Sequence, residues 1–422
     1  MARVLLLATT TGYQTRSFGE AAERLGVELV FATDRCHMID DPWRDQAIPI
    51  RFHDELSAVE AIVDATRSRP LDGFLVVGDR PTVIGARVGR ALGLPGHSPE
   101  AAAIARNKQR VRERLHGAGL PTPPFISTTI RDDALDVSRS LQYPVVVKPV
   151  ALSGSRGVMR ADDRDSFVAA CARLRAILQS PDILAERSDL HESVLVEGFI
   201  PGREYALEGL LHHGAFHVLA LFDKPDPLDG PFFEETIYVT PSAVARREQA
   251  AIVEAVTRAA NAIGLEHGAV HAECRVNRQG VFILEVAARP IGGLCSRALR
   301  FDAPGQEPIS LEELLLRHSL GESPEKWTRE SLASGVMMIP IPRRGIFRRA
   351  DRLEDARAVP GIEDVRVTAK TDQLLIPLPE GSSYLGFIFA RGERPSDVDG
   401  ALRTAHQHLR FTIDAEITLT RS

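Results

Sequence analysis

Cysteine is scarce in this sequence, long apolar runs are absent, and neither sign of charge dominates. The four cysteines indicate neither a disulfide scaffold nor a zinc site, because none of them forms a CxxC pair. No stretch approaches the roughly 18 consecutive apolar residues that cross a bilayer, so we do not expect a membrane protein. The 51 Lys and Arg residues against 57 Asp and Glu residues give a net charge of −6, which argues against a nucleic-acid partner.

What is present is the composition of an ordinary globular protein. With 422 residues, 44% of them hydrophobic and 26% charged, the chain can bury a large core and is long enough for roughly three domains. The opening segment MARVLLLATTTGYQTRSF has only a very short apolar run, so we expect a first strand there and no signal peptide. The cytoplasm is therefore the expected compartment.

Alternating strand and helix patterns predict an α/β unit over residues 1–97. Apolar runs at 3–8, 27–33 and 72–79 surround the helical pattern SFGEAAERLG, which is typical of a parallel sheet covered by helices. The turn TTTGYQTRS lacks the GxGxxG pattern, so we expect no dinucleotide cofactor in it.

Two further units, both of the α+β class, are expected at 98–305 and 306–422. Ser98 followed by proline predicts a helix start, and the helical stretch runs to Gly117 or Gly119. The segment LPTPPF then forbids helix and predicts a linker. Runs of strands around helices follow in both units.

The hairpin GAVHAECRVNRQGVFILEVAARP carries a pair of acidic residues. If residues 278–280 form its loop, Asn277 pairs with Val281, and counting back places Glu273 opposite Glu285. Because side chains alternate along a strand, one face then carries His271, Glu273, Glu285, Ala287 and Arg289.

Two carboxylates about 5 Å apart repel by roughly 3 kcal/mol at an effective dielectric constant of 20, so a cation must neutralise the pair. Mg²⁺ prefers oxygen ligands and binds through one or two carboxylates, which makes Glu273 and Glu285 candidate metal ligands. The alternative is that one glutamate points to solvent while Arg275 or Arg289 pairs with the other.

A second motif, VVVKPVALSGSRGV, delivers Lys148 from a buried strand to a flexible loop. Glycines free backbone N–H groups to cradle an anion, although the lysine precedes the loop here, unlike in a Walker A sequence. An ordinary hairpin turn is the alternative. The loop residues are Ser153, Gly154, Ser155, Arg156, Gly157 and Val158.

A third motif, VLVEGFIPGREYALEG, places Glu197 at the end of an apolar strand and Glu204 beside a turn. The backbone amides of Phe199 and Ile200 can read an adenine edge, and a carboxylate can hold ribose hydroxyls. Each glutamate taken alone is also compatible with a solvated surface.

In this order the motifs resemble the ATP-grasp superfamily over about residues 98 to 300. That family has a lysine in its central helical unit, a lysine before a glycine-rich loop, an adenine-hinge glutamate, a ribose glutamate and two metal carboxylates. The matching residues are Lys108, Lys148, Glu197, Glu204, Glu273 and Glu285. Residues 1–97 resemble the Rossmann-like pre-ATP-grasp domain, so the resemblance implies an ATP-grasp fold.

Within the superfamily the sequence is most similar to the L-amino acid ligases. Their metal strand is followed by an arginine and paired glycines, matched here by Arg289, Gly292 and Gly293, and the segments MMIPIPRRGIF and LPEGSSYLGFIFARG resemble their C-terminal domain. Many superfamily members carry Asn where this chain has Ala287, so a second magnesium is less expected.

This resemblance implies an ATP-dependent carboxylate–amine ligase that forms an amide bond, expected to be a dipeptide bond, through an acyl phosphate. The implied cofactors are ATP and Mg²⁺, with Mn²⁺ as a substitute, and the implied partners are small carboxylate and amine substrates, expected to be amino acids. Lys148 and Arg289 carry the catalytic roles. The implied substrate residues are Glu235, with Glu234 as its alternative, and His271, Arg289, Gly292 and Gly293.

Two other functions are compatible with the same spacings. A purine-pathway ligase of the superfamily would follow the metal glutamate with His-Asn and Ser-Gly-His, whereas this chain has RPIGGLCSRAL. A non-catalytic ATP-binding protein is the other alternative, and the intact set of lysines, loop and carboxylates argues against it. Both substrates and the oligomeric state, for which a homodimer is one option, are left open.

Overall fold

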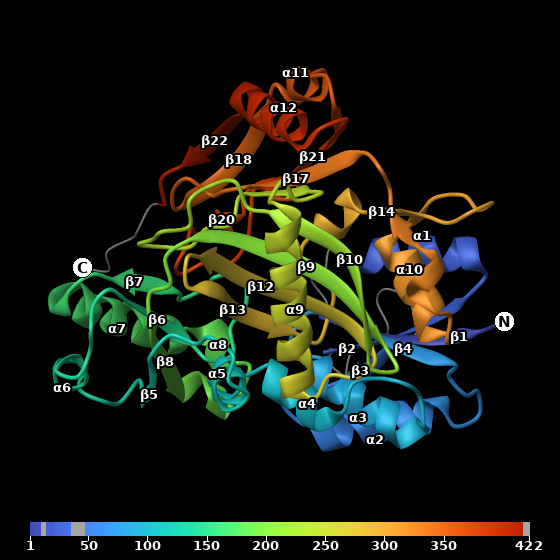
Figure 1. Cartoon of the computed structure of the whole chain (residues 1–422), viewed down its shortest axis with the longest axis horizontal. Helices are drawn as coiled ribbons and strands as arrows, with labels where there is room; N and C mark the ends of the chain where they lie inside the picture. The colour runs from blue at the N-terminus through green and yellow to red at the C-terminus, as the bar shows by residue number, and fades with distance from the viewer. Residues whose placement is uncertain (10–13, 35–46, 417–422) are drawn as a thin grey trace.

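The computed structural model describes residues 1–9, 14–34 and 47–416, and it has a mixed α/β architecture. Figure 1 shows a large central sheet with the N-terminal unit in blue at its lower right, a small green sheet at its lower left and the C-terminal segment in red above it. Among the described residues, no helix combines the length and the apolar character that a membrane span requires.

A four-stranded parallel sheet forms the N-terminal unit, as the strand pattern predicts. Along its central strand the side chains alternate, so that Leu5 and Leu7 enter one hydrophobic core while Val4 and Leu6 enter another. The strands in sheet order are β3 (Ile48–Ile50), β2 (Glu28–Asp34), β1 (Arg3–Ala8) and β4 (Gly73–Val77), and the helices are α1 (Thr15–Leu25), α2 (Glu55–Thr66) and α3 (Thr82–Leu92).

Two helices follow where the sequence predicts one continuous stretch: α4 (Pro99–Ala105) and α5 (Lys108–Gly117). The Ser98 side chain accepts a hydrogen bond from a backbone N–H of α4, which confirms the predicted helix start. The Asn107 side chain caps a second start in the same way, and this new cap separates α5 from α4. Lys108 therefore becomes the first residue of a helix, and its backbone N–H donates to the carbonyl of Val150 at 2.9 Å.

Residues 125–198 form a small antiparallel sheet with its own helices and hydrophobic core. The long helix on it begins at a capping box formed by Asp163 and Ser166. The strands in sheet order are β5 (Phe125–Thr129), β8 (Ser193–Gly198), β6 (Val145–Pro149) and β7 (Met159–Ala161), and the helices are α6 (Ala134–Ser138), α7 (Arg164–Leu178), α8 (Pro181–Leu184) and the 3₁₀ turn η1 (Asp189–Glu192).

The central sheet has eight antiparallel strands and crosses a predicted domain boundary. Ile237 pairs with Met337, so the sheet continues past the expected break between residues 305 and 306. The strands in sheet order are β13 (Gly280–Ala287), β12 (Gly268–Asn277), β9 (Arg203–His212), β10 (Ala215–Asp223), β11 (Ile237–Thr240), β17 (Ala333–Ile339), β21 (Gly386–Gly392) and β19 (Ile362–Val367).

Helix α9 (Arg246–Ile263) packs on the half of this sheet built from β9, β12 and β13, and α12 (Pro395–His408) packs on the other half (Figure 1). Helix α10 (Leu311–Ser319) lies beside α1 instead, so it packs on the N-terminal unit. The remaining elements are η2 (Cys295–Ala298), β14 (Arg300–Asp302), β15 (Ile309–Ser310), η3 (Pro324–Lys326), β16 (Thr328–Arg329), β18 (Gly345–Asp351), α11 (Leu353–Arg357), β20 (Leu374–Leu375) and β22 (Arg410–Asp414).

Candidate active site

The two acidic residues of the β12–β13 hairpin face each other as the sequence predicts. Glu273 pairs directly with Glu285, and both side chains line a cavity of about 390 Å³. The register is as predicted, but the predicted loop length and the predicted regular pairing are both wrong, and the two errors offset each other. The loop is one residue shorter than expected, because Asn277 pairs with Gly280, and a bulge at Leu284 restores the register.

This bulge changes which side chains face the cavity. Val281 and Ile283 lie in the hydrophobic core under α9, although simple alternation from Glu285 would put them on its own face. Past the bulge the core position moves to Val286, so Leu284 and Glu285 both line the cavity. The strand therefore presents an apolar and an acidic side chain next to each other at the site.

Most of the predicted site residues line this one cavity, although they come from segments far apart in the sequence. Three predicted ATP-binding residues, Glu197, Arg156 and Gly157, are not part of its lining. The predicted residues that do line it are Lys108, Lys148, Ser153, Gly154, Ser155, Val158, Phe199, Ile200, Glu204, Glu235, His271, Glu273, Glu285, Arg289, Gly292 and Gly293.

Glu197 lies behind the cavity wall, where it holds Lys148 in place. Its carboxylate pairs with Lys148 and accepts hydrogen bonds of 3.0 and 2.9 Å from the Arg112 guanidinium of α5. Burial lowers the pKa of Lys148, and the Glu197 carboxylate offsets part of that effect. The Glu197 side chain thus does not line the cavity, because both of its oxygens bind buried cations, and its predicted role in ATP binding stays a prediction.

Arg156 and Gly157 shape the loop from outside the cavity. The Arg156 guanidinium turns away and pairs with Asp182 at 2.6 Å. Gly157 has a positive φ of 74°, and its N–H donates to the carbonyl of Pro379 at 2.9 Å. The loop is thus closed against the C-terminal segment.

Lys224 is a central residue of the site that the sequence patterns did not identify. Its ammonium lies 2.8, 2.6 and 2.9 Å from carboxylate oxygens of Glu204, Glu235 and Glu273, and its side chain is 2% exposed. Burial alone would lower the pKa of Lys224, but the three carboxylates outweigh it and raise the pKa well above the ordinary value. The only signal in the sequence is a lysine two residues after the apolar run FHVLALF.

The three carboxylates around Lys224 differ in their cation partners and in the direction of their pKa shifts. Glu204 has cations on both oxygens, because Arg275 donates to its second oxygen at 2.9 Å. Burial and the neighbouring Glu273 carboxylate raise the pKa of Glu235 to about 8. Burial works in the same direction on Glu273, but Lys224 and His271 hold its pKa well below the ordinary value.

His271 is oriented by a buried acid on β9. Its Nδ1 pairs with Glu208, and its Nε2 lies 3.5 Å from Glu273. Burial alone would lower the pKa of His271, but the Glu208 carboxylate raises it to about 10. The second oxygen of Glu208 accepts the backbone N–H of Ile291 at 3.1 Å, which fixes the start of the Gly292–Gly293 segment.

Arg289 forms a two-point ion pair with Asp79 of the N-terminal unit. Asp79, just after β4, accepts hydrogen bonds of 2.7 Å from Nε and 3.0 Å from Nη2 of Arg289. Asp79 therefore occupies the Nε–Nη2 edge of the guanidinium, and the N–H groups outside that edge are the ones that could bind a phosphoryl group. No motif points to Asp79, apart from its place at the end of the predicted buried strand DGFLVVGD.

The C-terminal segment supplies a further wall of the cavity. Ser382, Ser383, Tyr384 and Phe387 line it, and Arg173 of α7 forms an ion pair with Glu380 beside them. The resemblance had assigned this segment to the C-terminal domain without a role in the site. It lies in the site because β21 belongs to the same sheet as β12 and β13.

The two hairpin carboxylates fit a magnesium ion by their chemistry. Both offer oxygen ligands from adjacent strands into one cavity, and their side chains are 16% and 22% exposed for Glu273 and Glu285. Lys108 lies 3.3 Å from Glu285, and Lys224 lies 2.9 Å from Glu273, so the protein balances these charges with its own cations.

Three family models match the chain in the order of its units. They are an ATP-grasp N-terminal domain over residues 19–96, an ATP-grasp domain over 141–298 and an L-amino acid ligase C-terminal domain over 337–414. The fold and the site therefore define an ATP-grasp ligase. More particularly, the chain combines the ATP-grasp domains with the C-terminal domain of the L-amino acid ligases.

Known relatives agree with this assignment. An L-amino acid ligase structure from Bacillus licheniformis superposes with a TM-score of 0.82 and 28% identity, covering 98% of this chain and 99% of that one. The alanine–anticapsin ligase of Bacillus subtilis is 27% identical over 56% of this chain and 52% of its own length. The D-alanine–D-alanine ligase B of Chromobacterium violaceum is 29% identical over 57% of this chain and 75% of its own length.

The chain spans about half the length of the curated alanine–anticapsin ligase that it matches. The relatives named above are ligases by name, and the fold of this chain is the ATP-grasp fold expected from the sequence.

Proposed function

We propose that this protein joins the carboxylate of an amino acid to an amine, expected to be a second amino acid, at the expense of ATP. The observation that carries the proposal is the facing pair Glu273 and Glu285, set in one cavity with the cations of Lys108, Lys148 and Arg289. Phosphoryl transfer needs chiefly such positioning and charge stabilisation.

The proposed reaction has two steps. A carboxylate oxygen of the first substrate attacks the γ-phosphorus of ATP, the bond to the ADP oxygen breaks, and an acyl phosphate forms. The amine nitrogen then attacks the carbonyl carbon, phosphate leaves with the bonding electrons, and the nitrogen loses a proton. The products are an amide, ADP and phosphate.

The residues around the cavity divide these tasks by their charge. Lys108 and Lys148 neutralise nucleotide phosphates, and the loop of residues 153–158 covers them with backbone N–H groups. Held by Glu273 and Glu285, a magnesium ion would supply charge neutralisation at the phosphate oxygens. Arg289, oriented by Asp79, faces the transferring phosphoryl group with its remaining N–H groups.

The substrate end of the cavity is acidic and supports an amino-acid substrate. Glu235 lines the cavity, whereas its neighbour Glu234 does not, so Glu235 is the better candidate partner for a substrate ammonium. Gly292 and Gly293 line the same cavity, and Tyr384 and Phe387 add an apolar wall for a substrate side chain.

The test is phosphate release by the purified protein with Mg-ATP and pairs of amino acids, with mass spectrometry of the products. We expect release above the rate without amino acids, together with a product whose mass equals the two amino acids minus water. Background hydrolysis with every pair would refute the dipeptide-forming function. Activity only with a ribonucleotide amine would favour a purine-type ligase instead.

A single substitution then tests the role of the hairpin. Glu285→Gln removes one negative charge from the facing pair, and we expect turnover to fall on the order of a hundredfold or more. The matched control is Glu248→Gln on the exposed face of α9, which we expect to keep wild-type turnover. Near wild-type turnover in Glu285→Gln would contradict the metal role.

A further inference from the structure

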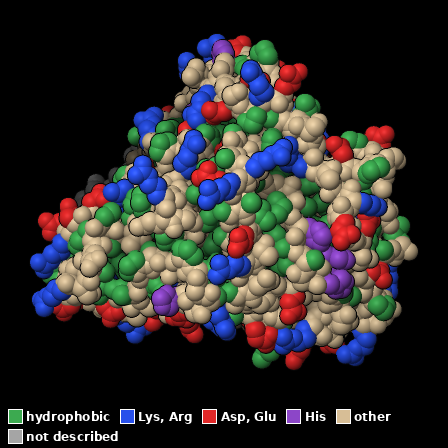
Figure 2. All heavy atoms as spheres, viewed as in Figure 1, with side chains coloured by type: hydrophobic (Ala, Val, Ile, Leu, Met, Phe, Trp, Pro, Cys, Tyr) green, Lys and Arg blue, Asp and Glu red, His purple; other side chains and the backbone are tan. Residues whose placement is uncertain are grey.

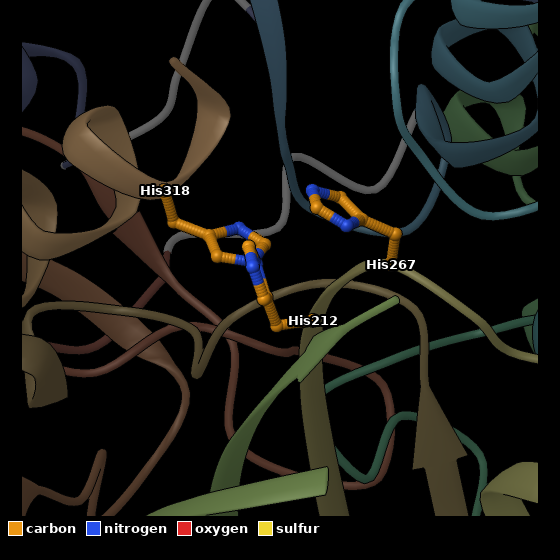
Figure 3. Close-up of side chains that lie close together, drawn as sticks. All are labelled: His212, His267 and His318. Carbon is orange, nitrogen blue, oxygen red and sulfur yellow. The ribbon is translucent and has the colours of Figure 1, made fainter. Parts of the chain in front are cut away.

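A cluster of histidines lies outside the cavity of the candidate active site, which we call the ATP cavity from the proposed function, at the opposite end of β9 and β12. His212 ends β9, His267 directly precedes β12, and His318 lies in the last turn of α10. Figure 3 shows the three rings turned toward one another from these separate elements. In Figure 2, histidine side chains form a patch on the surface just below α10.

The rings are close enough to share one ligand. The ring centroids of His267 and His318 are 4.3 Å apart, and that of His212 lies 5.3 Å from His318 and 5.4 Å from His267. One nitrogen of each ring lies within 4.8 Å of the corresponding nitrogens of the other two. The cluster thus offers three imidazole nitrogens around a common point.

One of these separations already equals that of a metal site. His212 Nδ1 lies 3.3 Å from His318 Nε2. Two imidazole nitrogens bound to a tetrahedral zinc ion at 2.0–2.1 Å are about 3.3 Å apart. A hydrogen bond between the two rings would also explain this pair, but it would not account for the third ring beside them.

Two of the three rings are shielded from solvent, because His267 is 6% exposed and His318 is 3% exposed. Among the described residues, no carboxylate forms an ion pair with any of the three rings. The backbone N–H of His213 donates to Nδ1 of His267 at 3.4 Å and helps to orient that ring.

The cluster also lies where three parts of the fold meet. Helix α10 packs against α1 and β4 of the N-terminal unit, whereas β9 and β12 belong to the central sheet. The backbone of Ser319, at the end of α10, lies close to Gly73 of β4. A Cβ atom on Gly73 would lie only 2.3 Å from the carbonyl oxygen of Ser319. A ligand shared by the three rings would therefore fasten α10 to the central sheet.

We propose that His212, His267 and His318 form a binding site for a divalent transition-metal ion of the zinc class. Imidazole nitrogens suit zinc, copper and nickel, whereas magnesium prefers the oxygen ligands of the ATP cavity. His212 is the half-exposed member, so water completes the coordination from the solvent side. The bound ion stabilises the packing of α10 against the ends of β9 and β12.

The test is metal binding by the full-length untagged protein after removal of bound metal with a chelator. The protein is dialysed against Zn²⁺ in excess Mg²⁺, which occupies the carboxylates of the ATP cavity, and bound zinc is measured by mass spectrometry. We expect one Zn²⁺ per chain, a higher Tm with Zn²⁺ than without it, and a visible absorption band of four-coordinate Co²⁺ when cobalt replaces zinc.

Variants assign the binding to the cluster. We expect His318→Gln and His212→Gln to bind Zn²⁺ at least tenfold more weakly, and His116→Gln, on the exposed face of α5, to bind it like the wild type. Glu285→Gln should also keep the zinc, because it alters only the ATP cavity. If His318→Gln does not fold, the half-exposed His212→Gln decides the matter.

Three results would overturn the proposal. They are the absence of stoichiometric zinc in the wild type, full retention of zinc in His212→Gln, and loss of zinc in Glu285→Gln with retention in the histidine variants. The last result would place the metal on the carboxylates of the ATP cavity. None of these readouts needs catalytic turnover, so the outcome does not depend on the proposed ligase activity.

Discussion

At the residue scale, the site is organised by buried cations that hold carboxylates in fixed states. Lys224 binds Glu204, Glu235 and Glu273 together, and Arg112 with Lys148 binds Glu197. A buried charge is costly unless it is paired, so these pairs fix the geometry of the cavity before any ligand enters. A carboxylate that keeps an oxygen without a protein cation can still bind a substrate group.

Glu235 is the carboxylate whose role a substitution can isolate. We expect Glu235→Gln to raise the KM for the amino acid on the order of tenfold or more, because a bound ammonium ion favours the charged form of the Glu235 carboxyl group, which an amide cannot adopt. The KM for ATP should change much less. The measurement is steady-state kinetics with each substrate varied in turn.

Glu234→Gln is the matched control for this substitution. Glu234 is the adjacent residue, it does not line the cavity, and the backbone of Ile341 donates to its carboxylate. We expect this variant to keep the wild-type KM for the amino acid. The reverse pattern, with the effect in Glu234→Gln alone, would transfer the role to Glu234.

At the element scale, the strands and their faces follow from sequence patterns, whereas local irregularities do not. The predicted pairing of Glu273 with Glu285 is right only because the shorter turn and the bulge at Leu284 offset each other. The bulge could not be predicted, because it depends on how β13 packs under α9. The break between α4 and α5 was readable in principle, since Asn107 is a good helix cap.

The glycine loop between β6 and β7 can be tested through one residue. Gly157 has a φ of 74°, and a Cβ there would lie 2.8 Å from Cδ1 of Leu174 and 3.3 Å from Pro149. We expect Gly157→Ala to distort the loop and to lower kcat/KM for ATP on the order of tenfold, because the backbone conformation disfavours any side chain.

The control for this loop is Gly117→Ala at the end of α5, where nothing lies within 4 Å of an added Cβ. We expect its kinetics to match the wild type. Equal kinetics in Gly157→Ala would show that the loop conformation is not needed for ATP use.

At the scale of the whole molecule, the units read from the sequence share their hydrophobic cores. One core joins Leu6 of β1 and Phe18 of α1 to Leu314 of α10 and Phe387 of β21. Sequence patterns indicate many of the strands and helices but not this sharing, because it arises from contacts between residues up to hundreds of positions apart. Asp79 and Tyr384 were missed as site residues for the same reason.

This sharing predicts that residues 1–305 cannot fold alone. The fragment would expose the edge of β11 that pairs with β17 and the apolar surface that α10 covers. We expect it to lack a cooperative unfolding transition by calorimetry and to bind a hydrophobic dye, unlike the full chain. The cut lies in an exposed loop at Gly305, so it breaks no helix or strand by itself.

Adding the missing part in trans provides the control for that experiment. When residues 306–422 are produced together with residues 1–305, β17 can pair with β11 again and α10 can return to α1. We expect the two pieces to co-purify and to recover a cooperative transition. A fragment of residues 1–305 that unfolds cooperatively and binds ATP without the second piece would contradict the shared core, because its central sheet would then be stable with β11 as an open edge.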